Sequence, residues 1–93
     1  RTVRNEGLAL TPSQEHGRQL FGITCGQCHK LAAAHTAGRI GPDLDKLKPN
    51  TPLVLDAIQR GRARGIGRMP AGLYRGKDAQ DIASFVNRTA GRQ

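Results

Sequence analysis

The chain has 93 residues, enough for one domain, and contains no run near the roughly 18 apolar residues that a membrane span needs. Its bulky apolar residues (Leu, Ile, Val, Phe, Met and Tyr) number only 21, which is few for the core of such a domain. Lys and Arg number 15 against 7 Asp and Glu, for a net charge of +8, so an anionic partner is expected. Either the chain is disordered, or something besides its own side chains fills the interior.

The N-terminal segment carries no targeting signal. The chain begins at Arg1 without an initiator Met or an apolar signal region, so any targeting segment is expected to lie outside this sequence. Residues 1–10 have no hydrophobic period and predict an extended lead-in to a domain at 11–93. A membrane tether or fusion outside the chain stays open.

The first predicted helix begins with the sequence Thr-Pro-Ser-Gln at 11–14. This sequence offers an N-cap, a proline at the first helical position and a capping-box glutamine. The helix is expected to run to about Thr24. Gly17, Phe21 and Cys25 recur every four residues, so they share one face of it.

The middle of the chain predicts a loop followed by a short helix. Residues 30–50 show no sustained period and contain scattered Gly and Pro, which favours a long loop. Such a loop in a small domain usually serves a site. Thr51 and Pro52 repeat the cap-and-proline signal and predict a helix that ends at Arg60, with Gly61 at the left-handed C-cap.

The last third predicts a second loop and a final helix. Residues 61–77 contain five Gly and no strand-like alternation. The helix is expected from Asp78 to about Thr89, ended by Gly91. Its apolar stripe consists of Ala79, Ile82, Ala83 and Val86, with Phe85 beside it. No segment predicts a β-strand, so the expected fold class is all-α.

The string Cys-Gly-Gln-Cys-His at 25–29 carries the most specific chemistry. It places two thiols one helical turn apart, with an imidazole directly after the second. In the signature for c-type haem attachment, the thiols add across the haem vinyl groups and the adjacent histidine binds the iron. One covalently attached haem would also supply the apolar interior that the chain lacks. We therefore expect one haem c on Cys25, Cys28 and His29.

Three other interpretations of the string compete. A thioredoxin-like redox pair needs a βαβ setting, which the pattern does not predict. A zinc site needs a second pair of ligands, whereas His16 and His35 are single residues on either side. A buried cysteine pair with an incidental histidine is the third. His16 and His35 are expected to face solvent or to form loop hydrogen bonds.

The second axial ligand is expected at Met69, the single methionine of the chain. It lies between Arg68 and Pro70 in a Gly-rich loop. Proline keeps the residue before it extended and contributes no donor of its own, which gives a stiff mount for a thioether ligand. A lone methionine is ordinarily core filler, but this position outside any helix stripe favours a ligand.

Over about residues 11–91 the chain resembles class I cytochrome c, the small monohaem electron carriers. The resemblance implies class I helices and loops wrapped around one covalently attached haem. It also implies that the glycine of the first helix lets the last helix cross closely, so that Ile82 and Phe85 lie against Gly17 and Phe21.

The same resemblance implies roles for two dipeptides. Gly41-Pro42 matches the family's Gly-Pro, in which the proline carbonyl accepts the proton on the second nitrogen of the ligand imidazole, here His29. Such a bond fixes the tautomer and makes the ligand more basic. Met69-Pro70 matches the family's Met-Pro pair. His29 and Met69 are therefore the expected iron ligands.

The expected function is single-electron transfer between extracytoplasmic redox partners, in a periplasm or on the outer face of a membrane. With both axial positions filled, the iron has no open position for a substrate, so we expect that the protein is not an enzyme. One alternative is a haem-based ligand-binding or sensing domain with a labile Met69. Another, from a different class, is a zinc-dependent basic module that binds nucleic acid.

A basic stretch at 57–77 leads into and out of Met69. It contains no acidic residue, and it is expected either to be solvated, to neutralise the haem propionates or to dock an acidic reductase or oxidase. Its cations are Arg60, Arg62, Arg64, Arg68, Arg75 and Lys77. Without interleaved aromatic residues it predicts no nucleic-acid partner.

Overall fold

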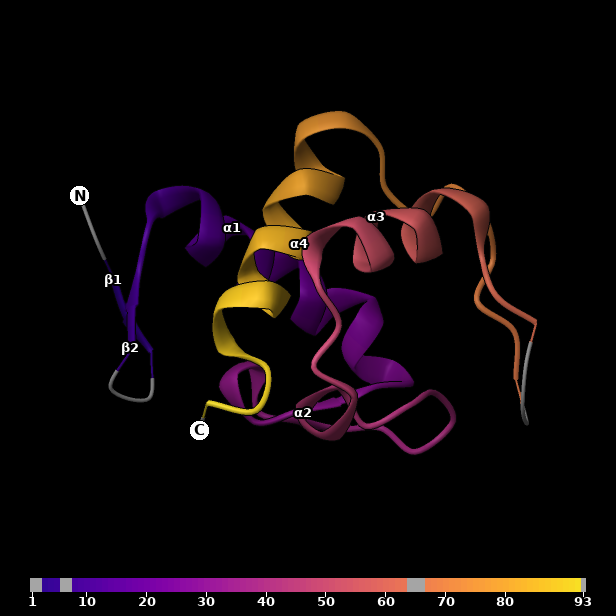
Figure 1. The fold of residues 1–93 in the computed structure, drawn as a ribbon, viewed down its shortest axis with the longest axis horizontal. Helices are drawn as coiled ribbons and strands as arrows, with labels where there is room; N and C mark the ends of the chain where they lie inside the picture. The colour runs from indigo at the N-terminus through magenta and orange to yellow at the C-terminus, as the bar shows by residue number, and fades with distance from the viewer. Residues whose placement is uncertain (1–2, 6–7, 64–66, 93) are drawn as a thin grey trace.

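The structure is a computed structural model that describes residues 3–5, 8–63 and 67–92 (Figure 1). Within these ranges no helix is both long enough and apolar enough to span a membrane. In chain order the elements are β1 (Val3–Asn5), β2 (Leu8–Leu10), α1 (Pro12–Ile23), the 3-10 turn η1 (Cys25–Gln27), β3 (Lys30–Leu31), the 3-10 turn η2 (Ala32–Ala34), β4 (Thr36–Ala37), α2 (Leu44–Leu47), α3 (Thr51–Arg60) and α4 (Gly76–Thr89).

Helix α1 begins with the predicted capping box. The Thr11 hydroxyl accepts a hydrogen bond from the Gln14 backbone N–H at 3.2 Å, and the Gln14 side chain accepts one from the Thr11 N–H at 3.0 Å. Two of the N–H groups that a helix start leaves without partners are thereby bonded. The predicted helix is confirmed, and it ends at Ile23.

The crossing of α1 and α4 forms the centre of the fold, as the two ribbons in the middle of Figure 1 show. A Cβ atom on Gly17 would lie 2.1 Å from the Asp81 carbonyl oxygen, so only glycine allows this approach. One turn further on, the rings of Phe21 and Phe85 meet edge to face with centroids 6.0 Å apart. The predicted crossing is confirmed.

The ends of the other two long helices differ slightly from the prediction. Asn50, not Thr51, caps α3, because its side chain accepts from the Leu53 N–H at 3.0 Å. Gly61 follows α3 with φ +78° but an extended ψ of 178°, so it is not a left-handed helical cap. Helix α4 begins at Gly76, two residues before the predicted start.

The expectation of an all-α fold is wrong in one respect, because four short strands form two antiparallel pairs. Strand β1 pairs with β2, with Asn5 opposite Leu8, and this hairpin stands at the left of Figure 1. Strand β3 pairs with β4, with Leu31 opposite Thr36. Strands of two or three residues are too short to show the alternation by which a sequence predicts them. The remainder of the fold is mostly helical.

The segment expected as a 30–50 loop is more ordered than predicted. It contains η2, the β3–β4 pair and the one-turn helix α2, which Asp43 caps. Leu31 from this segment is completely buried, as is Leu10 from the end of β2. Both join one core cluster with residues of α1, α3 and α4. Leu44 of α2 joins the same cluster, so the segment after η1 is fastened to the helical core at Leu31 and again at Leu44.

Candidate haem site

Cys25, Cys28 and His29 lie on one tight turn directly after α1. The backbone N–H groups of Cys28 and His29 donate to the Cys25 carbonyl at 3.1 and 2.9 Å. Cys25 is 7% exposed and Cys28 is half-buried, and both are free thiols. Burial raises the pKa of the Cys25 thiol to about 11. Cys25 is therefore protonated at neutral pH, unlike the reactive thiolate of a redox pair.

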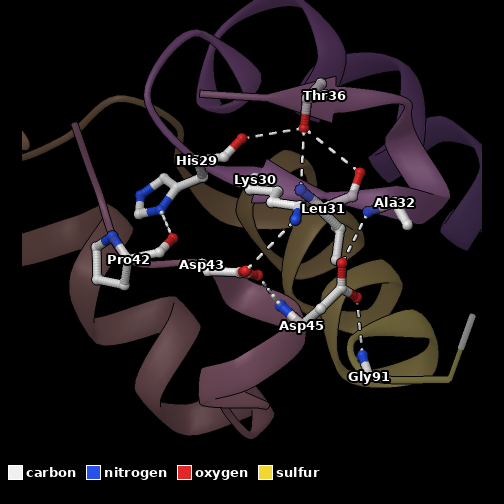
Figure 2. A network of polar contacts seen from close by, with 9 residues as sticks. All are labelled: His29, Lys30, Leu31, Ala32, Thr36, Pro42, Asp43, Asp45 and Gly91. Atoms are coloured by element: carbon white, nitrogen blue, oxygen red, sulfur yellow. Dashed lines mark hydrogen bonds and ion pairs between the residues drawn. The ribbon is translucent and has the colours of Figure 1, made fainter. Parts of the chain in front are cut away.

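The His29 ring is oriented by the Gly41-Pro42 dipeptide. Its Nδ1 lies 3.0 Å from the Pro42 carbonyl oxygen (Figure 2). Because a carbonyl oxygen only accepts, Nδ1 carries the proton of the neutral ring and Nε2 is left with a lone pair. A Cβ on Gly41 would lie 2.5 Å from the His29 Cε1, so the backbone of this dipeptide lies directly against the ring. The contact that the resemblance implies is present.

Two aspartates hold the segment that follows Pro42. Asp43 accepts from the Asp45 N–H at 3.0 Å, and its other oxygen lies 3.8 Å from the Lys30 ammonium. Asp45 accepts from the Ala32 N–H and from the Gly91 N–H, both at 2.9 Å. Figure 2 shows Asp45 between the strand after His29 and the C-terminal end of α4.

Met69 comes from a separate arm after α3. Its backbone forms two hydrogen bonds with Arg62, N–H to carbonyl in each direction and 2.8 Å long. Its side chain is half-buried and packs against the core cluster. The structure thus brings together Cys25, Cys28, His29 and Pro42. Among the described residues, no hydrogen bond joins Met69 to these four.

The other two histidines do not belong to a cluster of metal ligands among the described residues. His16 Nδ1 is 2.8 Å from the buried Asp81 carboxylate, and His35 is an exposed residue with φ +56° at the end of η2. In the part of the chain that the structure describes, no three His, Cys, Asp or Glu side chains come together as metal ligands would. The zinc alternative therefore gains no support.

The basic stretch is less uniform than the sequence indicates. Asp56, one residue before it, pairs with Arg60 at 3.2 Å and with Arg62 at 2.9 Å. Lys77 pairs with Asp81 at 2.9 Å. Arg64 lies outside the described residues. Of the described cations in this stretch, Arg68 on the Met69 loop and Arg75 directly before α4 are the two without an ion pair.

Comparisons with known proteins now identify the family. A family model described as cytochrome c oxidase, cbb3-type, subunit III, matches residues 12–86. The chain belongs to this family. The solved structure of the c-type cytochrome SorU from Sinorhizobium meliloti is also similar, with 34% identity and a TM-score of 0.72 over 85% of this chain and 92% of SorU. No curated protein matches the chain.

This cytochrome c domain is an electron carrier with a covalently bound c-type haem, and the resemblance to small monohaem cytochromes c is confirmed. The chain offers groups that fit such a haem: two free thiols on one turn and an imidazole whose Nδ1 is already bonded. Domains of this type are generally extracytoplasmic.

Sequence reasoning did not find three residues that support the site. Asp43 accepts from the Asp45 N–H, Asp45 accepts from the backbone N–H groups of Ala32 and Gly91, and the Thr36 hydroxyl donates to the His29 carbonyl. One signal for Asp43 was available, since an aspartate is a typical N-cap and a short Leu-Asp-Lys-Leu segment follows it. Asp45 carried no such signal because its partners Ala32 and Gly91 lie far from it in the chain, and Thr36 carried none because the strand pair that places it is only two residues long.

Proposed function

We propose that Cys25 and Cys28 hold the haem through thioether bonds, and that His29 and Met69 are the axial ligands of its iron. The observation that carries the proposal is the 3.0 Å contact between His29 Nδ1 and the Pro42 carbonyl. It leaves Nε2, the nitrogen on the opposite side of the ring, as the donor to a metal. When bound, the haem supplies the centre that gains and loses one electron.

Met69 is proposed as the second ligand because it is the single methionine and because two backbone hydrogen bonds with Arg62 hold it in place. A thioether opposite a histidine stabilises the reduced iron and gives a higher reduction potential than a second strong nitrogen donor. With both axial positions filled by this chain, no position is left for a substrate. We propose that the protein transfers electrons and does not catalyse bond chemistry.

Its redox partners are proposed to be extracytoplasmic and acidic where they dock. Arg68 lies next to Met69, and Arg75 directly precedes α4; neither forms an ion pair among the described residues. Positive charge at this place would increase the association rate with an acidic surface more than the final affinity.

The Met69→Ala variant tests the ligand assignment, with Leu73→Ala as the matched control. Leu73 is also half-buried against the core, but it has no donor atom. The oxidised wild type and Leu73→Ala should show the weak far-red absorption band of sulfur bound to iron. Met69→Ala should lose this band, have a lower reduction potential and bind added imidazole more tightly. An unchanged band in Met69→Ala would contradict the assignment.

A further inference from the structure

Thr36 makes two hydrogen bonds at the end of the attachment string. It lies in β4, opposite Leu31 of β3. Its hydroxyl donates to the His29 carbonyl at 3.0 Å and accepts from the Leu31 N–H at 3.2 Å. A second carbonyl, that of Leu31, lies 3.4 Å from the same oxygen. Figure 2 shows the hydroxyl above the peptide groups that leave His29.

The methyl group of the same side chain contacts the start of the string. A Cβ on Gly26 would lie 2.3 Å from the Thr36 Cγ2 atom, so the methyl group lies directly over that glycine. Thr36 therefore touches the turn at Gly26 with its apolar half and at His29 with its polar half.

We propose that Thr36 is a positioning residue for His29. The Thr36 hydroxyl fixes the His29 peptide, so that the imidazole keeps its hydrogen bond to Pro42. The inference rests on the proposed ligation by His29. The His29 ring is held at one end by its own backbone and at the other by the Pro42 carbonyl. Releasing the backbone end lets the ring rotate and lengthens the Nδ1 contact.

A longer Nδ1 contact has a predictable electronic effect. The Pro42 carbonyl makes the imidazole a more basic ligand because it accepts a hydrogen bond from Nδ1–H. When that bond weakens, His29 donates less electron density, which destabilises oxidised iron more than reduced iron. Loss of the Thr36 hydroxyl should therefore raise the reduction potential.

Two substitutions separate the halves of the side chain. Thr36→Val keeps the methyl contact with Gly26 and removes the hydroxyl, whereas Thr36→Ser keeps the hydroxyl and removes the methyl. Thr89→Val is the matched control, because the buried Thr89 hydroxyl also donates to a backbone carbonyl, that of Phe85, at 2.8 Å. All three variants are measured as the haem-loaded protein by redox titration and denaturant unfolding.

Thr36→Val should raise the potential, Thr36→Ser should leave it at the wild-type value, and Thr89→Val should lower the stability without moving the potential. A wild-type potential in Thr36→Val would overturn the proposal, as would equal shifts in Thr36→Val and Thr89→Val. If Thr36→Val does not fold, a shift of the reduction potential in Thr36→Ser is sufficient to overturn the proposal. Failure of the His29 ligation itself is seen separately, in wild type, as a His29 ring without haem-shifted proton resonances.

Discussion

The two sides of the proposed iron site are held by different kinds of contact. On the His29 side, side chains bond the backbone: Thr36 bonds the His29 carbonyl, and Asp45 bonds the segments that follow His29 and α4. Each contact depends on the identity of one residue. The position of His29 therefore depends on particular side chains, and a single substitution can disturb it.

On the Met69 side, the backbone does most of the holding. Met69 and Arg62 exchange two backbone hydrogen bonds, which almost any residues could make. The Arg62 guanidinium bonds the Gly61 carbonyl and the Asp56 carboxylate at the base of the arm, not the methionine. From this comparison we propose that His29 is the fixed ligand and Met69 the exchangeable one.

The largest effect on stability is expected from Gly41→Ala, which disturbs the packing around the His29 ring. The new Cβ would lie 2.5 Å from the His29 Cε1, and neither the ring nor the paired backbone can withdraw without losing the Pro42 contact. We expect a loss of about 1–3 kcal/mol in the free energy of unfolding, measured with denaturant, and a shifted potential.

Gly22→Ala is the control for that substitution. Gly22 lies inside α1, and nothing stands within 4 Å of its added Cβ. This variant should gain about 0.5–1 kcal/mol in stability, since alanine favours a helix over glycine. A Gly41→Ala protein as stable as Gly22→Ala would show that the His29 side is not tightly packed.

Charge reversal compares the two sides as docking surfaces. Arg68→Glu/Arg75→Glu reverses the two cations of the basic stretch that form no ion pair among the described residues, and it should lower the association rate with an acidic redox partner roughly tenfold at low salt. The dependence on ionic strength should flatten as well, because screening no longer removes an attraction. Stopped-flow rates across a salt series measure both quantities.

Lys46→Glu/Arg92→Glu carries the same change in net charge away from the Met69 arm. Lys46 is exposed on α2, and Arg92 follows α4, whose C-terminal end lies against α2. If this double variant slows the partner as much as the first, net charge and not the Met69 side guides docking.

A smaller effect is expected at the helix crossing that both sides share. Burial alone would raise the pKa of Asp81, but the hydrogen bonds and charges of His16 and Lys77 outweigh it and hold that pKa below the ordinary value of 3.8. The ionised form therefore stabilises the fold above pH 3.8, and this contribution is lost as the pH falls through the lower folded-state pKa.

Asp81→Asn should accordingly cost about 1 kcal/mol at neutral pH, a modest value because both partners are largely solvated. The difference from wild type should vanish at acid pH, and the reduction potential should not change. Urea unfolding from pH 7 downwards is the measurement. A difference independent of pH would mean that packing, not charge, is lost.

The smallest effect is expected from Gly67→Ala on the Met69 side. Its Cβ would lie 2.4 Å from the Ile40 Cγ2, a methyl branch of a side chain that is 53% exposed and has room to change its χ1 rotamer. The cost should stay below about 1 kcal/mol, and it should disappear in an Ile40→Ala background, where the clashing atom is gone. A cost that persists in the double variant would place the clash in the backbone.

The contrast between the two sides also decides what a sequence can predict. Local signals were sufficient for the capping box at Thr11, for the four-residue spacing of Gly17 and Phe21, and for the attachment string. Each is encoded within a few residues. The two-residue strands around Thr36 are too short for a period to be visible.

Contacts between distant segments were not predicted from the sequence, for another reason. Asp45 meets a partner 46 residues away at Gly91, and Arg62 finds Asp56 just outside the stretch of cations. Such pairs depend on where folded segments meet, which composition and spacing do not encode. They are also the contacts that hold the two sides of the site.

The most direct test of the account is the position of the methionine methyl resonance. Because Met69 is the single methionine, labelling with methyl-¹³C methionine gives one NMR signal. In the reduced protein, ligation to iron would place that methyl group above the haem ring, and the ring current would shift its proton resonance strongly upfield. Ligation by Met69 predicts this shifted signal. A methyl resonance at its ordinary position would contradict the ligation by Met69.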